Sequence, residues 1–390
     1  MWIQKKAGWI FTGYIAGSLL LFLYSFTQVD LSLTLTEFSV WQRIQQFFQH
    51  VGFFQRPLST ALYVGILSLW FVLYGVAVSA AESGKLTAYG VWRIALVITA
   101  LLWLSYPAFS YDIFNYMFTA KTVLVYHKNP YLVIPLDFTG VEPWLSFMRW
   151  THLPSAYTPL WILTTLPFYL MGFGYFLPIL WSIKLITGVA FLWTVSLIGQ
   201  VVMKVEPKKA ALGMAIFALN PLVVIETLVS GHNDILMMAL VLWAVLLMLE
   251  KKNIVSWIIL SLSAAAKLMT VFVAPVMIAY YGRTFKAWRQ WLLAAMMVGF
   301  ILVCTKREVL PWYWVWIMPF VALLPSKRQI FILSVGVSLG LLLRYAPYLY
   351  LGHWDPPVPV IKLWVTWVPI VISAIIVLFK EVRRDKGITI

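Results

Sequence analysis

The chain has 390 residues, of which 62% are hydrophobic and only 11% are charged, with a formal net charge of +15. Soluble domains carry about 45–50% apolar and about 25% charged residues, and burial grows too slowly with chain length for one core to enclose the excess. The composition excludes a soluble enzyme, a disordered segment and a nucleic-acid-binding module, and it predicts an all-α polytopic membrane protein. The lone cysteine, Cys304, cannot form an intramolecular disulfide.

Runs of about 20 apolar residues predict membrane-crossing helices. The first, Gly8–Phe26, follows Lys5 and Lys6. No small-residue cleavage site comes after it, so we expect a retained helix with its N-terminus in the cytoplasm. The later candidates are Leu58–Ala80, Val91–Phe109, Tyr175–Met203, Ala210–Leu228, Ile235–Leu249, Gln290–Thr305, Pro311–Leu324, Gln329–Tyr345 and Val360–Phe379.

Two segments between these candidates read as amphipathic helices in the plane of the bilayer surface. One is Phe38–Phe54, and the other is Ile113–Tyr126, which opens the long loop from Ser110 to Thr158. In the second, apolar residues such as Phe114 and Met117 share one face, a pattern typical of an interfacial helix. A third loop, 346–359, is rich in prolines and also carries a histidine and an aspartate.

The apolar stretch Ile254–Tyr281 is interrupted by Lys267. A single crossing would leave this lysine near the bilayer centre, at a cost of roughly 2.5–3.5 kcal/mol on insertion scales. It would also separate Lys252 from Arg283, Lys286 and Arg289, whereas basic residues collect in cytoplasmic loops. We therefore expect two short helices that form a hairpin with Lys267 at its outer tip.

The segment Pro159–Met171 is expected to be re-entrant, because counting it as a crossing would place Lys204, Lys208 and Lys209 outside. The resulting topology has about twelve crossings, within a range of about 11–13, with both termini in the cytoplasm. Most basic residues then lie inside, so the positive charge is an orientation signal and no nucleic-acid partner is needed. All five histidines and most acidic residues fall outside, which predicts chemistry on the non-cytoplasmic face.

The motif SYDIFNY, residues 110–116, holds the best candidate for a catalytic group. Asp112 would sit at the lipid–water boundary among aromatic side chains, where partial desolvation raises the pKa of a carboxyl group toward the range of a general base. The alternative is that Asp112 only caps the helix that follows.

Three further motifs are candidates on the same face. HKNPY contains Asn129 and Tyr131, SAYTPL contains Tyr157, and SGHND contains His232, Asn233 and Asp234. Asn-Pro and Thr-Pro pairs also shape ordinary loops. His232 and Asp234 would supply part of a divalent-metal site, but no second ligand cluster is evident, so a metal-free site is favoured.

The remaining candidates are cations and aromatics. Lys267 at the hairpin tip would either snorkel to the interface or bind a lipid phosphate. Lys306 and Arg307 precede PWYWVW, which contains Trp312 and Tyr313. Aromatic belts are common at membrane interfaces, yet these basic residues beside aromatics would suit an anionic leaving group with a sugar or prenyl chain.

Together and in this order, YDIFNY, NPY, YTPL, SGHND, AAAKL and PWYWVW resemble the integral-membrane glycosyltransferases of the GT-C class. The similarity is greatest to polyprenol-phosphate-mannose-dependent mannosyltransferases and covers residues 91–325 of a single transmembrane domain, residues 1–390. The acidic pair D-x-D of many relatives is absent here, because Asp112 lies between Tyr111 and Ile113. That departure argues against a bound metal.

The resemblance implies a polyprenyl-phosphate sugar donor, with mannose as the usual sugar, and a glycan, lipid or protein acceptor. It implies inverting transfer with Asp112 as base, and help for the departing phosphate from Lys267, Lys306, Arg307 and His232. It places Tyr111, Asn129, Tyr131, Tyr157, Asn233, Asp234, Trp312 and Tyr313 around the substrates. No cofactor is expected. The protein is expected to lie in a prokaryotic cell membrane and to take part in the synthesis of envelope glycans.

The alternative class is a transporter or flippase of lipid-linked glycans. A transporter would place ionisable residues near the bilayer midplane. Most acids of this chain collect instead at outer helix ends, although Glu226 and Lys184 lie deeper in their predicted helices. A purely structural membrane scaffold would not explain why every histidine falls on one face.

Overall fold

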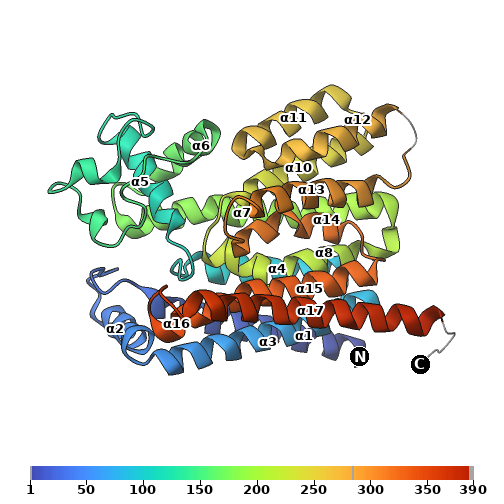
Figure 1. The fold of residues 1–390 in the computed structure, drawn as a ribbon, viewed down its shortest axis with the longest axis horizontal. Helices are drawn as coiled ribbons and strands as arrows, with labels where there is room; N and C mark the ends of the chain where they lie inside the picture. The colour runs from blue at the N-terminus through green and yellow to red at the C-terminus, as the bar shows by residue number, and fades with distance from the viewer. Residues whose placement is uncertain (1, 283–284, 386–390) are drawn as a thin grey trace.

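The computed structural model describes residues 2–282 and 285–385, and these residues form helices and no strand (Figure 1). The first half contains α1 (Trp2–Ser25), α2 (Ser39–Phe54), α3 (Arg56–Glu82), α4 (Ala88–Trp103), α5 (Asp112–Leu124), α6 (Pro159–Leu170) and α7 (Phe176–Val205). The second half contains α8 (Ala210–Ala218), α9 (Pro221–Val224), α10 (Asp234–Leu249), α11 (Asn253–Ala266), α12 (Ala274–Gly282), α13 (Trp288–Cys304), α14 (Met318–Ala322), α15 (Arg328–Leu343), α16 (Ala346–Leu351) and α17 (Val358–Asp385).

The long helices run side by side, and α1 begins at the end of the bundle where α17 finishes (Figure 1). Helices α2, α5 and α6 lie at the opposite end, together with the loop 125–158 (Figure 1). We call that end, residues 26–54 and 105–175, the outer layer. The start of α1 and the end of α17 therefore lie at one end of the molecule, and the cytoplasmic location of both termini stays a prediction.

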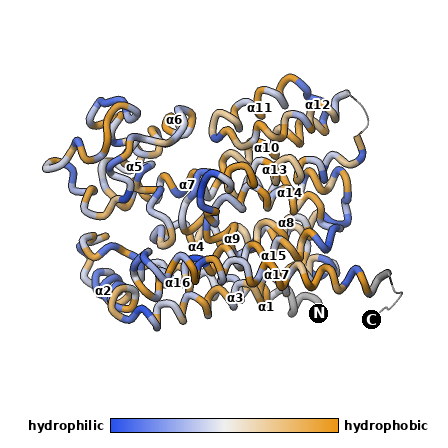
Figure 2. The backbone as a smooth tube through the Cα atoms, viewed as in Figure 1, coloured by the Kyte–Doolittle hydropathy of each residue, from blue (hydrophilic) through white to orange (hydrophobic). Residues whose placement is uncertain are grey.

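Within the described residues, five helices are long and apolar enough to cross a membrane: Gly8–Gln28, Arg56–Glu82, Phe176–Val205, Arg328–Leu351 and Val358–Val382. Pro207–Ala218 and Pro221–Val229, bent by 55° at the break between them, can count as a sixth. Hydrophobic residues dominate these helices (Figure 2). The all-helical polytopic architecture agrees with the prediction, but about twelve crossings are not confirmed, because the other apolar helices are shorter than a full span.

The hairpin expected at Lys267 is present. Helix α11 ends at Ala266, Lys267 is extended with φ −163°, and the chain returns through a 3-10 helix, η6 (Leu268–Val273), and α12. Trp257 near the start of α11 packs against Tyr281 near the end of α12, with ring centroids 6.2 Å apart. Arg283, which helped to predict the hairpin, lies outside the described residues.

Several predicted elements differ from those observed. Helix α5 is not an amphipathic helix on the bilayer surface, because most of its residues from Ile113 to Thr122 are buried against α6 and α7. The predicted span Val91–Phe109 ends as a helix at Trp103. The predicted span Pro311–Leu324 is a 3-10 helix, η7 (Pro311–Trp316), followed by the short α14. Proline inside an apolar run breaks such a helix, since it removes a backbone donor.

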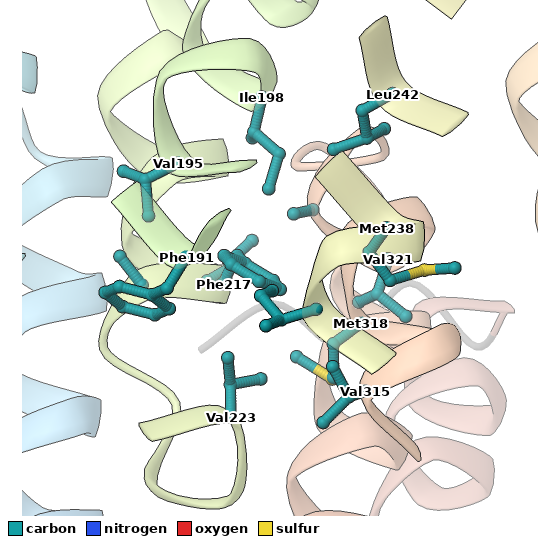
Figure 3. Close-up of a cluster of buried hydrophobic side chains, with 14 of the residues drawn as sticks. Phe191, Val195, Ile198, Phe217, Val223, Met238, Leu242, Val315, Met318 and Val321 are labelled. Carbon is teal, nitrogen blue, oxygen red and sulfur yellow. The ribbon is translucent and has the colours of Figure 1, made fainter. Parts of the chain in front are cut away.

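The centre of the bundle is a dry core (Figure 3). Phe191 of α7, Phe217 of α8, Met238 of α10 and Met318 of α14 are completely buried in it. Burying a side chain of this size stabilises the fold by about 1.5–3 kcal/mol when it leaves water. Around this core η7 packs against α10 and α14 packs against α8, which fixes the position of η7, a segment of the cavity wall.

Lys184 of α7 ties the end of α4 in place. Its side chain is 1% exposed, and its Nζ donates to the carbonyl oxygens of Leu102 at 2.9 Å and Ser105 at 2.6 Å and to Ser105 Oγ at 2.8 Å. An ammonium group has three protons to donate, so the three acceptors match its capacity. A cation is also favoured beside the unpaired carbonyls of a helix C-terminus. Lys184 therefore fixes the segment that leads from α4 to Asp112.

Replacing Lys184 by Met should lower the thermal unfolding midpoint of the detergent-solubilised protein. The substitution leaves the buried Ser105 carbonyl without a donor, at a cost of about 1–3 kcal/mol, whereas the Leu102 carbonyl still accepts from the Ser105 backbone N–H and Oγ. The matched control is Lys208→Met, because Lys208 is an exposed lysine in the short 3-10 turn, η4 (Pro207–Lys209), that precedes α8. Equal midpoints for both variants would show that Lys184 does not hold α4.

Candidate functional site

A cavity of about 600 Å³ lies between the outer layer and the hairpin of α11. Its wall combines a carboxylate, two cations and several aromatic rings. The lining residues used below are Asp112, Tyr157, Asn233, Lys267, Arg307, Trp312, Tyr313 and Trp316. These residues come from segments that are far apart in the sequence, and the fold brings the predicted motifs YDIFNY, YTPL, SGHND, AAAKL and PWYWVW to one place.

Asp112 is the carboxylate on the cavity wall. It occupies the first turn of α5 but does not cap the helix: Tyr111 holds the N-cap position, and Ser110 Oγ accepts from the Asp112 backbone N–H at 3.3 Å. Its side chain is 23% exposed. Burial raises the pKa of the Asp112 carboxyl, His232 and Lys267 lower it, and Asp234 raises it further. The net direction is upward, as a general base requires.

The SGHND segment follows a single π-helical turn, η5 (Ile225–Val229), at the end of α9. Isolated π turns inside helices are frequent at functional sites. The backbone N–H of His232 donates to the Glu226 carbonyl at 3.1 Å, so the chain folds back over the turn. Gly231 between them has φ +74°, and a Cβ atom there would lie 2.8 Å from Ile113 Cδ1. Any other residue would adopt a strained left-handed backbone here and would displace the end of the Ile113 side chain, so glycine is favoured at this position.

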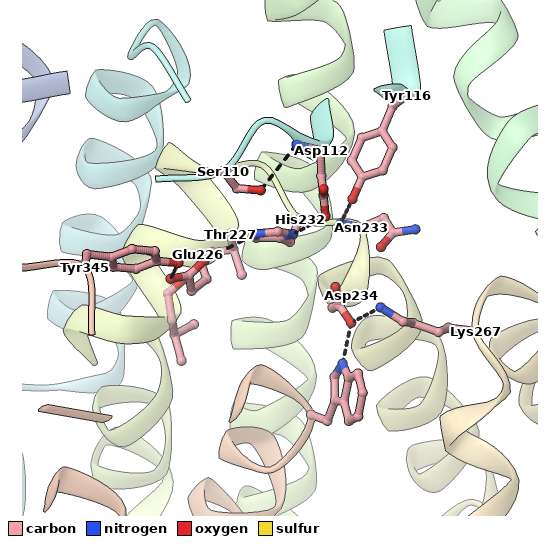
Figure 4. Close-up of polar contacts among 12 residues, drawn as sticks. Ser110, Asp112, Tyr116, Glu226, Thr227, His232, Asn233, Asp234, Lys267 and Tyr345 are labelled. Carbon is pink, nitrogen blue, oxygen red and sulfur yellow. Dashed lines mark hydrogen bonds and ion pairs between the residues drawn. The ribbon is translucent and has the colours of Figure 1, made fainter. Parts of the chain in front are cut away.

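His232 is fixed behind the cavity wall. Its Nδ1 lies 3.6 Å from Asp112 Oδ2 and its Nε2 lies 3.3 Å from Glu226 Oε2 (Figure 4). The ring stacks on Trp312, with centroids 4.1 Å apart and planes at 19°. Trp312 lines the cavity and His232 does not. The imidazole therefore faces two carboxylates instead of the space that a phosphate would occupy.

Lys267 and Asp234 form the second charged pair. Lys267 Nζ lies 2.6 Å from Asp234 Oδ1, which also accepts a hydrogen bond from Trp316 Nε1 (Figure 4). Asp234 is buried, whereas the Lys267 side chain is 33% exposed. The ammonium lies 5.2 Å from the Trp316 ring centroid, within the range of a cation–π contact. Asp234 holds Lys267 at the cavity and leaves part of its charge available to a ligand.

The YTPL segment closes the cavity toward the outer layer. Thr158 caps α6 and its Oγ1 donates to the Ala266 carbonyl at 3.0 Å, which joins this loop to the hairpin. The Tyr157 ring packs edge-on against Tyr116, with centroids 4.6 Å apart. Tyr131 OH donates to the Tyr157 carbonyl at 2.7 Å, and Asn129 Oδ1 accepts from the Tyr131 backbone N–H at 3.0 Å. The NPY motif therefore supports the loop that carries Tyr157.

Six of the predicted site residues do not line the cavity. His232 and Asp234 lie behind its wall, and the other four are more distant in the fold. Asn129 and Tyr131 act through the loop just described. Tyr111 lies under Arg149, whose Cζ is 5.2 Å from the ring centroid. Lys306 is exposed, whereas its neighbour Arg307 lines the cavity. That the predicted site residues contact a substrate stays a prediction.

Three residues that contact the predicted site residues were not predicted from the sequence. Glu226 is fully buried, yet it was not assigned to the site, and Tyr345 OH donates to its Oε1 at 2.9 Å. Trp316 and Tyr116 were also not singled out. An ionisable residue within an apolar run is a sequence signal for function, and Glu226 inside the predicted span Ala210–Leu228 carries that signal.

Among the described residues, no group of three or more His, Cys, Asp or Glu side chains is placed to hold a metal ion. Asp112, His232 and Glu226 are neighbours, but the imidazole lies between the two carboxylates. That the reaction needs no metal stays a prediction.

A bundle of apolar helices with one cavity lined by a carboxylate, two cations and apolar residues defines a helical membrane protein with a candidate site for an amphipathic ligand. Residues 11–283 match the model of the MptA_B family, described as alpha-(1->6)-mannopyranosyltransferase, N-terminal domain. The match covers more than half of the chain, and the chain therefore belongs to this family. The resemblance to GT-C mannosyltransferases is confirmed, and the protein is a glycosyltransferase of a mannosyltransferase family.

No curated protein and no solved structure gave a match. The family match ends before Arg307, Trp312 and Trp316, so it does not cover these three residues of the cavity wall.

Gly231→Ala should lower transfer activity more than Gly84→Ala. Both glycines have similar positive φ values, +74° and +71°, so both substitutions carry the same backbone cost of about 1–2 kcal/mol. Only the Cβ at position 231 meets another residue, Ile113, which is next to Asp112. Thermal midpoints and initial rates of the two purified variants check this. Equal activities would mean that Gly231 does not position the site.

Proposed function

We propose that this protein transfers a mannosyl group from a polyprenyl-phosphate donor to an acceptor hydroxyl, with inversion and with Asp112 as the general base. The observation that carries the proposal is the single cavity that Asp112, Lys267 and Arg307 line together. A base and two cations are what direct displacement at a sugar phosphate needs.

The chemistry is a single displacement. Asp112 accepts the proton of the acceptor hydroxyl, and the acceptor oxygen forms a bond to C1 of the sugar. The bond from C1 to the phosphate oxygen breaks, and the polyprenyl phosphate leaves with the electron pair. Lys267 and Arg307 offset the charge that develops on the phosphate. We assign this role to them rather than to His232 or Lys306, neither of which lines the cavity.

The donor is proposed to be lipid-linked because the cavity wall continues onto apolar residues. Leu268, Phe272, Val303 and Leu310 follow Lys267 and Arg307 around the opening, and Leu268 is 73% exposed. A polyprenyl chain would cover such a surface, because burying apolar area is favourable at about 25 cal/mol per Å². A nucleotide sugar would have no matching apolar part.

The non-cytoplasmic face is proposed from the position of the basic residues. Asp234, which holds the cavity residue Lys267, begins α10. Just after the other end of α10, Glu250 Oε1 lies 3.6 Å from Lys204 Nζ. Near that same distant end, Arg289 Nη1 bonds to Glu206 Oε1 at 2.5 Å. Basic residues collect on the cytoplasmic side, which leaves the cavity at the other end of the bundle.

The family description names an α-(1→6) linkage. We propose the same linkage here, so that the acceptor hydroxyl is a primary O6 of a mannoside. Inverting displacement that yields an α-mannoside requires a β-linked mannosyl phosphate in the donor.

Asp112→Asn should abolish transfer and leave the protein folded. A general base contributes about 10²–10⁴-fold to rate, and the amide cannot accept the proton. The assay uses radiolabelled polyprenyl-phosphate mannose with an alkyl α-mannoside acceptor. Asp355→Asn is the matched control, since Asp355 is an exposed carboxylate on the loop 352–357. Turnover retained in Asp112→Asn would end the assignment of the base.

Lys267→Met should raise KM for the donor more than KM for the acceptor, because the lost charge faces the phosphate. The single variant also leaves buried Asp234 without its cation. The double variant Lys267→Met/Asp234→Asn removes both charges. If Lys267 binds the donor phosphate as well as neutralising Asp234, the double variant should regain thermal stability while its donor KM stays high. A donor KM that is restored in the double variant would argue that Lys267 has only a structural role.

A further inference from the structure

The base is backed by a second carboxylate that no substrate can reach. Asp112, His232 and Glu226 form a chain in which one imidazole lies between two carboxylates (Figure 4). The side chains of His232 and Glu226 are 1% and 0% exposed, and neither residue lines the cavity. Any role of Glu226 in the reaction must therefore be exerted through His232.

A charged imidazole fits between two ionised carboxylates better than a neutral one. A neutral imidazole has one N–H and one acceptor nitrogen, whereas the imidazolium donates from both nitrogens. Each ring nitrogen of His232 faces a carboxylate oxygen, at 3.6 Å on the Asp112 side and at 3.3 Å on the Glu226 side. Neither contact is a hydrogen bond, but with both carboxylates ionised an imidazolium is attracted to each of them, whereas a neutral imidazole presents its lone pair to one of them.

Glu226 in turn has few other partners. Its Oε1 accepts from Tyr345 OH at 2.9 Å. Its Oε2 has no hydrogen-bond partner among the described residues, and His232 Nε2, which also has none, lies 3.3 Å away. A buried carboxylate without an opposite charge is costly by several kcal/mol. Glu226 and a protonated His232 therefore stabilise each other in this apolar surrounding.

Stacking adds to the same preference. The face of the Trp312 ring lies 4.1 Å from the His232 centroid, nearly parallel at 19°. An aromatic face attracts a cation, and the effect grows when the pair is removed from water. Trp312 also fixes the plane of the imidazole, which keeps Nδ1 directed at Asp112.

Ionisable groups from several elements surround Asp112, His232 and Glu226. Asp112 is faced by His232, Lys267, Asp234, Tyr116 and Tyr157, with Arg307 on the same cavity wall. Glu226 is faced by His232, Tyr345 and Tyr63. Among these groups His232 alone contacts both carboxylates.

We propose that Glu226 is a positioning residue for the base: it keeps His232 protonated and aimed at Asp112, so that Asp112 stays ionised in its partly buried site. This inference rests on the proposed function, because it takes Asp112 as the base. The direction agrees with the electrostatics, since His232 is the largest of the influences that lower the pKa of Asp112.

The consequence is a pH dependence with a definite sign. The base works in its ionised form, so kcat falls as pH falls through the pKa of Asp112. Losing the charge on His232 removes the influence that lowers this pKa, and the acid limb of the kcat profile then moves to higher pH. A neighbouring opposite charge shifts a carboxyl pKa by about 1–3 units, so the expected displacement is about one unit or more.

The test measures kcat against pH for Glu226→Gln with radiolabelled polyprenyl-phosphate mannose and an alkyl α-mannoside at saturating concentrations. We expect the acid limb to move up by about one unit or more, with kcat recovering toward the unsubstituted value at high pH and donor KM little changed. Glu250→Gln is the matched control, a carboxylate at the other end of α10, and its profile should not move.

A double variant separates this role from a general loss of structure. In the background of His232→Gln, the further change Glu226→Gln should leave the acid limb where it is, because the two residues act as one unit. A limb that does not move in Glu226→Gln, or that moves again in the double variant, overturns the inference.

Two results distinguish a failure of this inference from a failure of the proposed function. Turnover retained in Asp112→Asn would sink the base itself, whereas an inactive Asp112→Asn with an unshifted Glu226→Gln profile sinks only the role of Glu226. Where Glu226→Gln does not fold, Tyr345→Phe replaces it. That variant removes the hydrogen bond to Glu226 Oε1, so the same upward shift, smaller in size, is expected, and an unshifted profile contradicts the inference.

Discussion

A charge enclosed by an apolar helical bundle must meet an opposite charge or a full set of hydrogen-bond partners, and this constraint organises the centre of the protein. Three enclosed groups show how it is met. Lys184 donates to three oxygens at the end of α4, Asp234 holds Lys267, and Glu226 holds His232. Each partnership also fixes the position of a segment that borders the cavity, so the same contacts that stabilise the bundle build the site.

The constraint also divides the site into two sides. On one side Lys267 meets the cavity with an ammonium that Asp234 only partly satisfies, since a lysine has three protons to donate. On the other side Asp112 meets the cavity in front of a buried imidazole. A phosphate and an acceptor hydroxyl can therefore be bound by different groups within one cavity of about 600 Å³. The SGHND segment serves both sides, because His232 and Asp234 are two residues apart and point to different partners.

Much of this arrangement could be predicted from the sequence, and the rest depends on tertiary contacts. The position of Lys267 at a hairpin tip followed from the cost of placing a lysine in lipid and from the placement of the basic residues. The grouping of the motifs around one site was implied by the resemblance to GT-C glycosyltransferases. The burial of α5 could not be predicted, because its apolar face was read as facing lipid when α6 and α7 cover it. The pairing of Glu226 with His232 depends on a π turn and a left-handed glycine, and a single sequence gives no reliable signal for a turn of that kind. The predicted span Pro311–Leu324 was read as continuous from its hydropathy, although its prolines break it into two short helices.

The central claim is a direct displacement on a lipid-linked mannosyl phosphate, and the anomeric configuration of the product tests it most directly. The purified protein would be incubated with synthetic β-linked polyprenyl-phosphate mannose and an alkyl α-mannoside, and the one-bond carbon–proton coupling at the new anomeric centre would be measured by NMR. The account predicts an α-mannosidic product joined at O6. A β-mannosidic product, which retains the donor configuration, would contradict it.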